Sequence, residues 1–364
     1  MKFLDEYRNP TLGRLLVEKI RQRSIKGMRI MEFCGGHTVT IMKYGLRHLL
    51  SPQVEMISGP GCPVCVTTVA DLDKAIALAK KPGVIVATFG DLFKVSGSYS
   101  SLQKVRAEGG EVRVVYSAQD ALDIAQKNPA KSVVFISIGF ETTAPTIAAS
   151  LLEARDKGIT NYYILLSLKL CPPVMKALLD SGETKLDGII CPGHVSSIIG
   201  SHPYEFIPRD HGVACVIAGF EPLDILLAID MLAEQIERGK PKVEIAYRRG
   251  VKPEGNREAL KIMKTVFEVS EADWRGIGVV AASGLKLKAE YQNFNAENAF
   301  DIDSNPSVEP EGCICGDILR GVKTPFDCKL FGKTCTPEHQ VGPCMVSSEG
   351  TCAAYFHYGA YDGR

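Results

Sequence analysis

The stretch Met28-Arg29-Ile30-Met31-Glu32-Phe33, followed by Cys34-Gly35-Gly36-His37-Thr38, decides the predicted fold of this chain. Its first part is a short, mostly apolar run that ends in turn residues, which is typical of a buried β-strand. The Gly-Gly turn then leads into a helical segment. Units of this kind assemble into a parallel sheet with helices on both faces.

The same alternation of strands and helices continues along the chain. Further strand candidates are VEMISG (54–59), GVIVATFG (83–90), VRVVYS (112–117), SVVFISIGFE (132–141), NYYILLSL (161–168), LDGIICPG (186–193) and VACVIAGFE (213–221). Helical stretches stand between them, and this βαβ rhythm indicates parallel sheets. We therefore predict an α/β fold with two similar domains, each with a central parallel sheet flanked by helices, followed by a loop-rich C-terminal domain.

The predicted boundaries follow changes in pattern and composition. Apolar residues at near-helical spacing over 11–26 predict an opening helix. The strand pattern restarts after Pro129, residues 242–256 resemble a connector, and glycine, cysteine and short segments dominate the rest. The predicted regions are an N-terminal helical segment 1–27, a first α/β domain 28–128, a second α/β domain 129–245 and a C-terminal domain 246–364.

Composition and charge narrow the class of protein. Of the 364 residues, 45% are hydrophobic and 23% charged, and 42 basic side chains balance 42 acidic ones. The chain therefore lacks the excess of positive charge that favours binding to nucleic acid. The charged N-terminus lacks the apolar stretch of a signal peptide, and no window is long enough for a membrane span. We therefore expect a cytoplasmic protein, in which clustered cysteines are metal ligands or redox groups.

Six of the twelve cysteines lie near the C-terminus, namely Cys313, Cys315, Cys328, Cys335, Cys344 and Cys352. Four thiolates suffice for an iron–sulfur cluster or a zinc ion. Two cysteines are then left over. The spacing therefore suggests a metal site with a redox-active pair beside it.

Two motifs with cysteine follow the first two predicted strands. Cys34 precedes a helix, whose dipole would stabilise a thiolate there, and His37 would assist. Cys62 and Cys65 form a Cys-x-x-Cys pair after a Gly-Pro-Gly turn, which favours a redox dithiol. Zinc binding is the alternative for this pair, but it requires two more ligands. For both motifs, a structural turn with buried cysteines is the simpler interpretation.

Polar motifs end the later strands. Glu141 is a candidate acid or base, and His194 is a candidate metal ligand or proton carrier. Caps or turns are equally good interpretations of each residue alone. Cys171, Cys191 and Cys215 lie in apolar surroundings and are expected to be buried, and Trp274 is expected to pack in a core. Phosphate-binding glycine patterns are absent, which disfavours a nucleotide-binding enzyme.

Taken together, the motifs resemble the HypD family of hydrogenase maturation factors. The resemblance rests on CGGHT, GPGCPVC, GFETT, PGHVS, GFEPLDIL, CGDILRG and MVSSEGTCAAYF, and extends from Phe3-Leu4-Asp5-Glu6-Tyr7 to the end of the chain. It implies a scaffold that acts with the partners HypC and HypE. On this scaffold the iron centre of [NiFe]-hydrogenase, which carries cyanide and carbon monoxide, would be assembled.

The resemblance also implies roles for individual residues. Cys34 would hold the iron of the nascent centre, and Cys62 and Cys65 would form a redox dithiol nearby. Cyanide would be taken from a thiocyanate on HypE, a step that requires reducing equivalents. His37, Glu141 and His194 would face the same cleft between the two α/β units.

A [4Fe–4S] cluster is the cofactor that the resemblance implies. The family's ligands map onto Cys315, Cys328, Cys335 and Cys352, which leaves Cys313 and Cys344 as the adjacent redox pair. An alternative assignment exchanges Cys313 for Cys315, and spacing alone leaves both open. Glu349 lies close to Cys352 in sequence, where it would orient a ligand, serve a proton step or cap a helix.

Two other hypotheses belong to different classes. A cytosolic thiol–disulfide oxidoreductase acting on proteins would use Cys62 and Cys65 but would have no use for Cys34. A structural zinc protein would use the C-terminal cysteines only for folding and would leave the strand-end motifs unexplained.

Overall fold

The computed structural model describes residues 5–50, 52–302 and 306–359, so the first four residues of the predicted segment 1–27 lie outside it. The strands are β1 (Met28–Glu32), β2 (Val54–Ser58), β3 (Val84–Thr88), β4 (Glu111–Val114), β5 (Ser132–Gly139), β6 (Tyr162–Leu168), β7 (Gly188–Pro192), β8 (Ala214–Ala218), β9 (Val243–Ile245), β10 (Phe267–Trp274) and β11 (Gly278–Leu287). All eight strand candidates therefore contain or overlap an observed strand.

The helices are, in chain order, α1 (Pro10–Arg23), α2 (Gly35–Lys43), α3 (Leu46–Leu50), α4 (Pro63–Val66), α5 (Val69–Ala79), α6 (Gly90–Lys94), α7 (Leu102–Ala107), α8 (Ala118–Lys127), α9 (Ala144–Asp156), α10 (Cys171–Ser181), α11 (Gly193–Ile199), α12 (Phe206–His211), α13 (Pro222–Arg238), α14 (Arg257–Val266), α15 (Ala296–Ala299), α16 (Cys315–Leu319), α17 (Pro343–Val346) and α18 (Thr351–Tyr358). Four short 3₁₀ turns complete the described elements: η1 (Asp5–Arg8), η2 (His202–Tyr204), η3 (Ala289–Phe294) and η4 (Pro325–Asp327). Within the described ranges, no helix combines the length and apolar character needed to cross a membrane.

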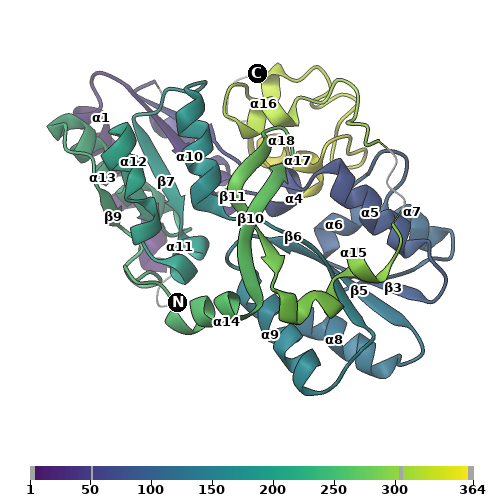
Figure 1. Ribbon diagram of the computed structural model, residues 1–364. Coiled ribbons are helices and arrows are strands. Elements are labelled where there is room, and N and C mark those ends of the chain that lie inside the picture. The colour runs from purple at the N-terminus through teal and green to yellow at the C-terminus, as the bar shows by residue number, and fades with distance from the viewer. Residues whose placement is uncertain (1–4, 51, 303–305, 360–364) are drawn as a thin grey trace.

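Two parallel sheets form the two lobes seen in Figure 1. The first has the strand order β2-β1-β7-β8-β9, and the second has the order β4-β3-β5-β6. Central strands such as β3 and β8 are buried along their whole length, because helices cover both faces of each sheet. This double burial explains why they appear in the sequence as continuous apolar runs. The predicted α/β class with two parallel sheets is confirmed.

The chain visits the first sheet twice. Strands β1 and β2 begin it, β3 to β6 build the second sheet, and β7 to β9 return to complete the first. The predicted range 28–128 therefore contributes strands to both sheets, as does 129–245. The four predicted domain boundaries themselves stay a prediction.

Three strands beyond residue 241 were not predicted. The presumed connector 242–256 contains β9, which pairs in parallel with β8. Strands β10 and β11 form a long antiparallel hairpin that lies between the lobes in Figure 1. Much of this hairpin is exposed, so its strands lack the apolar run that marked the others. Loop-rich structure with short helices begins only after α15 and continues to α18, in agreement with the predicted character of the C-terminal region.

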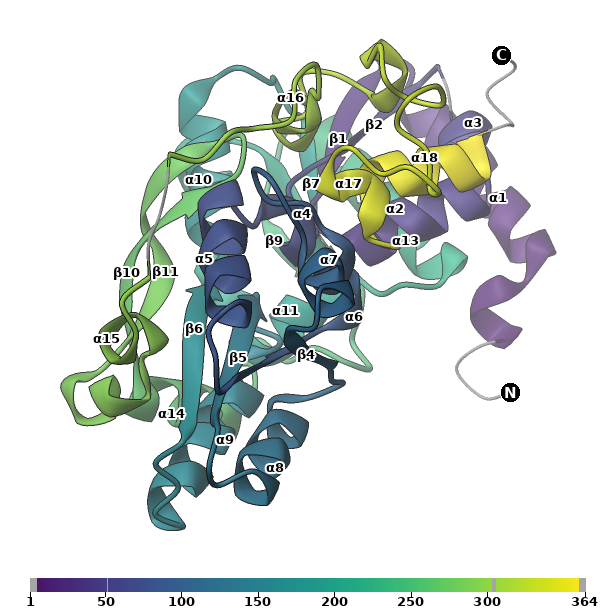
Figure 2. The same ribbon diagram turned by 90° about the vertical axis from the view of Figure 1, so that its right-hand side faces the viewer.

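The C-terminal region is part of the second lobe's core. One face of the β4-β3-β5-β6 sheet packs in a hydrophobic cluster that includes Val86, Val134 and the buried cysteines Cys335, Cys344 and Cys352. Helix α18 also contacts α2 of the first lobe. Figure 2 shows α17 and α18 beside α2. The cysteine-rich region thus touches both lobes.

Candidate functional site

Each parallel sheet has one point where its strand order reverses. This point lies between β1 and β7 in the first sheet and between β3 and β5 in the second. In open α/β sheets, ligands bind outside the carboxyl ends of the strands at such points. Cys34 follows β1 and His194 follows β7, while Asp91 follows β3 and Glu141 follows β5. Three predicted site residues therefore stand where this fold places its ligands.

Cys34 is fixed by a buried carboxyl group. Its backbone N–H donates to Oε2 of Glu32 at 3.0 Å, and the Thr38 hydroxyl donates to the other carboxyl oxygen. Burial raises the pKa of Glu32 to about 8, although these hydrogen bonds oppose the shift. Cys34 itself is 8% exposed and precedes the first turn of α2. The glutamate thus ties the strand end to the turn that presents the thiol.

The prediction that the helix dipole and His37 stabilise a thiolate at Cys34 is wrong. Burial raises the pKa of the Cys34 thiol to about 12, and the nearby carboxyl groups of Glu349 and Glu32 raise it further. Burial likewise lowers the pKa of His37 to about 4, so its ring is neutral at physiological pH. The helix dipole and His37 therefore do not offset the loss of solvation.

His37 and His194 meet through an aromatic ring that sequence reasoning missed. Phe220 lies between them, with ring centroids 4.9 Å from His37 and 3.8 Å from His194. His37 Nε2 is 3.3 Å from the carbonyl oxygen of Ala218, and its Nδ1 has no partner among the described residues. Burial also lowers the pKa of His194. The structure thus gathers two neutral imidazoles beside Cys34.

Cys62 and Cys65 are joined in a disulfide that lies against the Cys34 loop. The Cys65 N–H donates to Cys62 Sγ at 3.1 Å, and both side chains are buried. A Cβ at Gly61 would lie 2.3 Å from the backbone nitrogen of Cys34, so only glycine permits this approach. Gly35 in turn donates its N–H to the Gly61 carbonyl at 3.2 Å. The two motifs are therefore in direct backbone contact.

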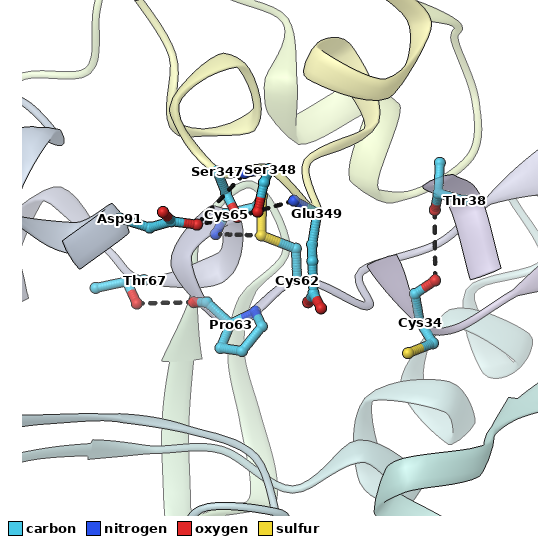
Figure 3. The surroundings of a disulfide bond; sticks show 10 residues. All are labelled: Cys34, Thr38, Cys62, Pro63, Cys65, Thr67, Asp91, Ser347, Ser348 and Glu349. Carbon is cyan, nitrogen blue, oxygen red and sulfur yellow. Dashed lines mark hydrogen bonds between the residues drawn. A yellow bond between two sulfur atoms is a disulfide. The ribbon is translucent and has the colours of Figure 1, made fainter. Parts of the chain in front are cut away.

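A third segment, residues 347–350, reaches the same place from the C-terminal region. Ser347 Oγ donates to Asp91 Oδ2 at 3.1 Å, and the Ser348 N–H donates to the same oxygen at 3.3 Å. A Cβ added at Gly35 would lie 2.4 Å from the backbone carbonyl oxygen of Glu349, so the two backbones are in close contact. Figure 3 shows the Glu349 carboxyl group on the side of Cys62 that faces Cys34. Burial and the charge of Asp91 raise the pKa of the Glu349 carboxyl group.

Glu141 approaches the site through Cys171. Its Oε1 accepts the Cys171 N–H at 2.9 Å, while its buried Oε2 has no partner among the described residues. Burial raises the pKa of Glu141 to about 7. Burial and the neighbouring Glu141 raise the pKa of the Cys171 thiol. Cys171 is therefore buried as expected, and its backbone N–H holds the Glu141 carboxyl group.

The C-terminal cysteines surround a small cavity. Five of them line it together with apolar side chains: Cys313, Cys315, Cys328, Cys335 and Cys352. Cys313 Sγ lies 3.3 Å from Cys315 Sγ, and a Cβ at Gly342 would come within 2.6 and 2.7 Å of these sulfurs. Over the described ranges, no three His, Cys, Asp or Glu side chains are placed to hold one metal ion.

Cys344 is not among the residues that line this cavity. It is fully buried, and its thiol shares hydrogen bonds with those of Cys315 and Cys352. Helix α17, which carries Cys344, packs against α4, which carries Cys65. Both cysteines belong to the same hydrophobic cluster. The C-terminal thiols and the Cys62–Cys65 disulfide are thus neighbours in one core.

Three contributors to the site were not predicted from sequence: Glu32, Asp91 and Phe220. Asp91 and Phe220 follow β3 and β8 directly, so the strand-end rule that found Glu141 would also have found them. Glu32 is a charged residue in an otherwise apolar strand, which is itself a signal of a buried interaction.

Comparison with known proteins identifies the family of this chain. A family model described as "HypD: Hydrogenase formation hypA family" matches residues 11–359. The hydrogenase expression/formation protein HupD of Azotobacter chroococcum is 46% identical, over 99% of this chain and 97% of its own length. Hydrogenase maturation factors HypD2 of Bradyrhizobium diazoefficiens and HypD of Cupriavidus necator are 46% and 44% identical, each over 99% of this chain and 98% of its own length. This chain is therefore a member of the HypD family of hydrogenase maturation factors.

Proposed function

We propose that the chain is a cytoplasmic scaffold that, with HypC, holds the iron of a [NiFe]-hydrogenase centre while cyanide and carbon monoxide are attached. One observation carries this proposal. The Cys34 loop, the Cys62–Cys65 loop and residues 347–350 come from three distant parts of the sequence and meet in direct contact. A protein that only exchanged disulfides would need the second of these segments alone.

Cys34 is the proposed anchor for the iron, which is the cargo of the reaction. An iron bound to cyanide and carbon monoxide needs a soft anionic ligand, and a thiolate supplies it. The high pKa of the metal-free thiol keeps it protonated. A bound cation deprotonates a coordinating thiol, so loading of iron would release the proton. The neutral state of His37 and His194 means that neither ring repels the incoming cation.

Cys62 and Cys65 are the proposed source of electrons for cyanide transfer. In this step the S–C bond of a thiocyanate on HypE breaks, its sulfur leaves as a thiolate and the carbon passes to the iron as cyanide. This cleavage consumes two electrons. The dithiol provides both when it closes to the disulfide, and it releases two protons. The disulfide of the structure is then the oxidised end of the cycle.

Glu349 is the proposed acceptor for one of these protons. Its carboxyl group faces the space between Cys62 and Cys34 (Figure 3), and its raised pKa favours proton uptake. Asp91 contributes to that shift and holds the segment in place through Ser347 and Ser348. Glu141, whose carboxyl group accepts the Cys171 N–H and whose pKa is raised to about 7, is the proposed acceptor of the other proton.

A [4Fe–4S] cluster fits the C-terminal cavity by the chemistry of its donors. Thiols and apolar walls surround the space, and a cluster distributes its thiolates over separate irons rather than around one ion. The contacts of Cys344 favour the assignment in which Cys313, and not Cys315, is a cluster ligand. Cys344 shares a hydrogen bond with Cys315 but only a charge interaction with Cys313. We therefore propose Cys315 and Cys344 as the redox pair, with Cys313, Cys328, Cys335 and Cys352 as ligands; when bound, the cluster would supply single electrons.

Vibrational spectroscopy on the protein purified with HypC tests the central proposal. Cyanide and carbonyl stretching bands are expected in the wild type and absent from Cys34→Ala. The matched control is Cys215→Ala, which also removes a buried thiol but from strand β8, and it should keep the bands. Bands of normal intensity in Cys34→Ala would overturn the role of Cys34. Iron analysis of the protein alone should give about four irons per chain.

A further inference from the structure

His194 depends on Phe220 for its orientation. Its imidazole is exposed and stacks on the Phe220 ring, with the two centroids 3.8 Å apart. Within the ranges that the structure describes, the ring nitrogens of His194 make no hydrogen bond. The same phenyl ring stacks on the buried His37 at 4.9 Å. The position of Phe220 therefore sets the place of an exposed imidazole that has no other anchor of this kind.

Phe220 is seated between two glycine turns and a tyrosine. A Cβ at Gly36 would lie 3.0 Å from Phe220 Cδ1 and 3.9 Å from Cys34 Sγ, so the phenyl ring and the thiol are both close to this glycine. A Cβ at Gly193 would lie 3.1 Å from Phe220 Cε2 and 3.1 Å from Tyr247 Cδ1. The Tyr247 ring meets Phe220 edge-on, with centroids 6.1 Å apart. Tyr247 is therefore one wall of the space that holds Phe220.

Arg249 holds both Tyr247 and the turn that carries Phe220. Its guanidinium carbon lies 4.7 Å from the centroid of the Tyr247 ring, which is a cation–π contact. Its Nη1 and Nη2 donate to the two carboxyl oxygens of the buried Asp224 at 2.6 and 2.5 Å. Asp224 Oδ2 also accepts the backbone N–H of Glu221, the residue after Phe220, at 3.1 Å. Arg249 thus acts on Phe220 by two routes, one through a ring and one through the backbone.

The N-terminal turn η1 adds a second aromatic contact to Arg249. The guanidinium carbon lies 3.8 Å from the centroid of the Tyr7 ring. The next residue, Arg8, donates from Nη2 to Glu221 Oε1 at 2.9 Å and pairs through Nε with the other carboxyl oxygen. A bidentate carboxylate pair combined with two aromatic contacts requires a planar guanidinium group, which lysine lacks.

We propose that Arg249 is a positioning residue for the iron-assembly site, because it sets the place of Phe220 and, through this ring, the orientation of the His194 imidazole. An exposed side chain without such a contact exchanges between rotamers, so the stack prepares the imidazole before iron arrives. The role rests on the proposed function, in which the iron is held at Cys34. The position of His194 itself is measurable whether or not iron is bound.

NMR of the full chain with labelled histidine measures the position of His194. The ring current of Phe220 moves the His194 ring protons upfield. Arg249→Lys keeps the charge but loses the planar contacts, so it should move these resonances toward the values of free histidine. Tyr247→Leu should do the same, whereas Tyr247→Phe retains the ring and should resemble the wild type. Arg248→Lys, at the exposed neighbouring position, is the matched control and should not shift them.

Vibrational spectroscopy of the same variants, purified with HypC, measures the effect on function. The cyanide and carbonyl bands should weaken about tenfold in Arg249→Lys and Tyr247→Leu, the lower end of the loss caused by removing a residue that orients a metal site. Tyr247→Phe and Arg248→Lys should keep the bands.

The two measurements separate the positioning role from the proposed function. Unchanged His194 resonances in Arg249→Lys and Tyr247→Leu would overturn the positioning role, and shifted resonances with bands of normal intensity would overturn its importance for iron assembly. If Arg249→Lys does not fold, Tyr7→Leu, which removes only one aromatic contact, should shift the resonances in the same direction, and an unchanged spectrum would overturn the proposal. A wild type without bands would overturn the proposed function, while the resonances would still show whether Arg249 positions His194.

Discussion

The Cys34 loop and the C-terminal cysteines are held in place by different means. Cys34 and the Cys62–Cys65 pair follow β1 and β2, which pair in parallel along five residues each. The C-terminal cysteines lie among α16, α17, α18 and η4, and none of these elements exceeds eight residues. Helices of this length are not stable by themselves. The first region is positioned by a sheet, whereas the second depends on its side chains and on what they bind.

The largest expected effect is therefore in the C-terminal region. Cys328→Ala should remove the proposed cluster and loosen residues 313–358, while β1 keeps its protection. Binding of a structural metal is worth roughly 10 kcal/mol or more of folding free energy in small metal domains. Iron analysis and hydrogen–deuterium exchange measure both effects. Cys215→Ala is the control, and full iron content in Cys328→Ala would exclude Cys328 as a ligand.

The stability of the protein around the Cys34 loop should depend on pH. Glu32 has a folded pKa of about 8, above its ordinary value of 4.5, so the folded state binds the proton more tightly. Its contribution to stability is full below pH 4.5 and is lost as the pH rises through 8, by up to about 1.4 kcal/mol for each unit. Glu32→Gln mimics the protonated form and should flatten this slope.

Denaturant unfolding of both proteins at pH 5, 6, 7 and 8 measures the slope. Glu141, with a pKa of about 7, contributes in the same direction. The difference between the wild type and Glu32→Gln therefore isolates Glu32. Equal slopes in the two proteins would show that the carboxyl group is ionised in the folded state and that the loop is held by charge.

This contrast also explains how much could be predicted from sequence. Most of strands β1 to β8 were found because strands buried on both faces form apolar runs, and the site motifs were found because they follow such strands. The hairpin β10–β11 was missed because it is largely exposed. The raised pKa of Cys34 depends on burial and on the charge of Glu349, which is 315 residues away in the chain, and both arise only through folding. For the same reason, spacing could not decide whether Cys313 or Cys315 is the cluster ligand, because the neighbours of Cys344 are set by packing.

The junction between the two regions should be sensitive to a single methyl group. Gly35→Ala would place a Cβ 2.4 Å from the Glu349 carbonyl oxygen, which is backbone and cannot rotate away. Overpacking of this kind costs about 1–3 kcal/mol. Gly13→Ala is the matched control, because its nearest neighbour is a leucine methyl at 3.6 Å and alanine favours a helix. Denaturant unfolding should show a loss for the first variant and none for the second; equal stability would mean that the two regions are not pressed together at Gly35.

Cys62→Ala should have the smallest effect on stability, although we expect it to abolish function. Under reducing conditions, Cys62→Ala removes the acceptor of the Cys65 N–H and should cost only about 1–2 kcal/mol. The variant should keep its iron, because no sheet or cluster depends on that thiol, yet it should not mature hydrogenase. Unfolding, iron content and hydrogenase activity in the same preparations distinguish these outcomes. Normal maturation would remove the redox role of the pair. Loss of iron would show instead that the dithiol loop supports the C-terminal region. The region positioned by the sheet and the C-terminal region would then not be independent.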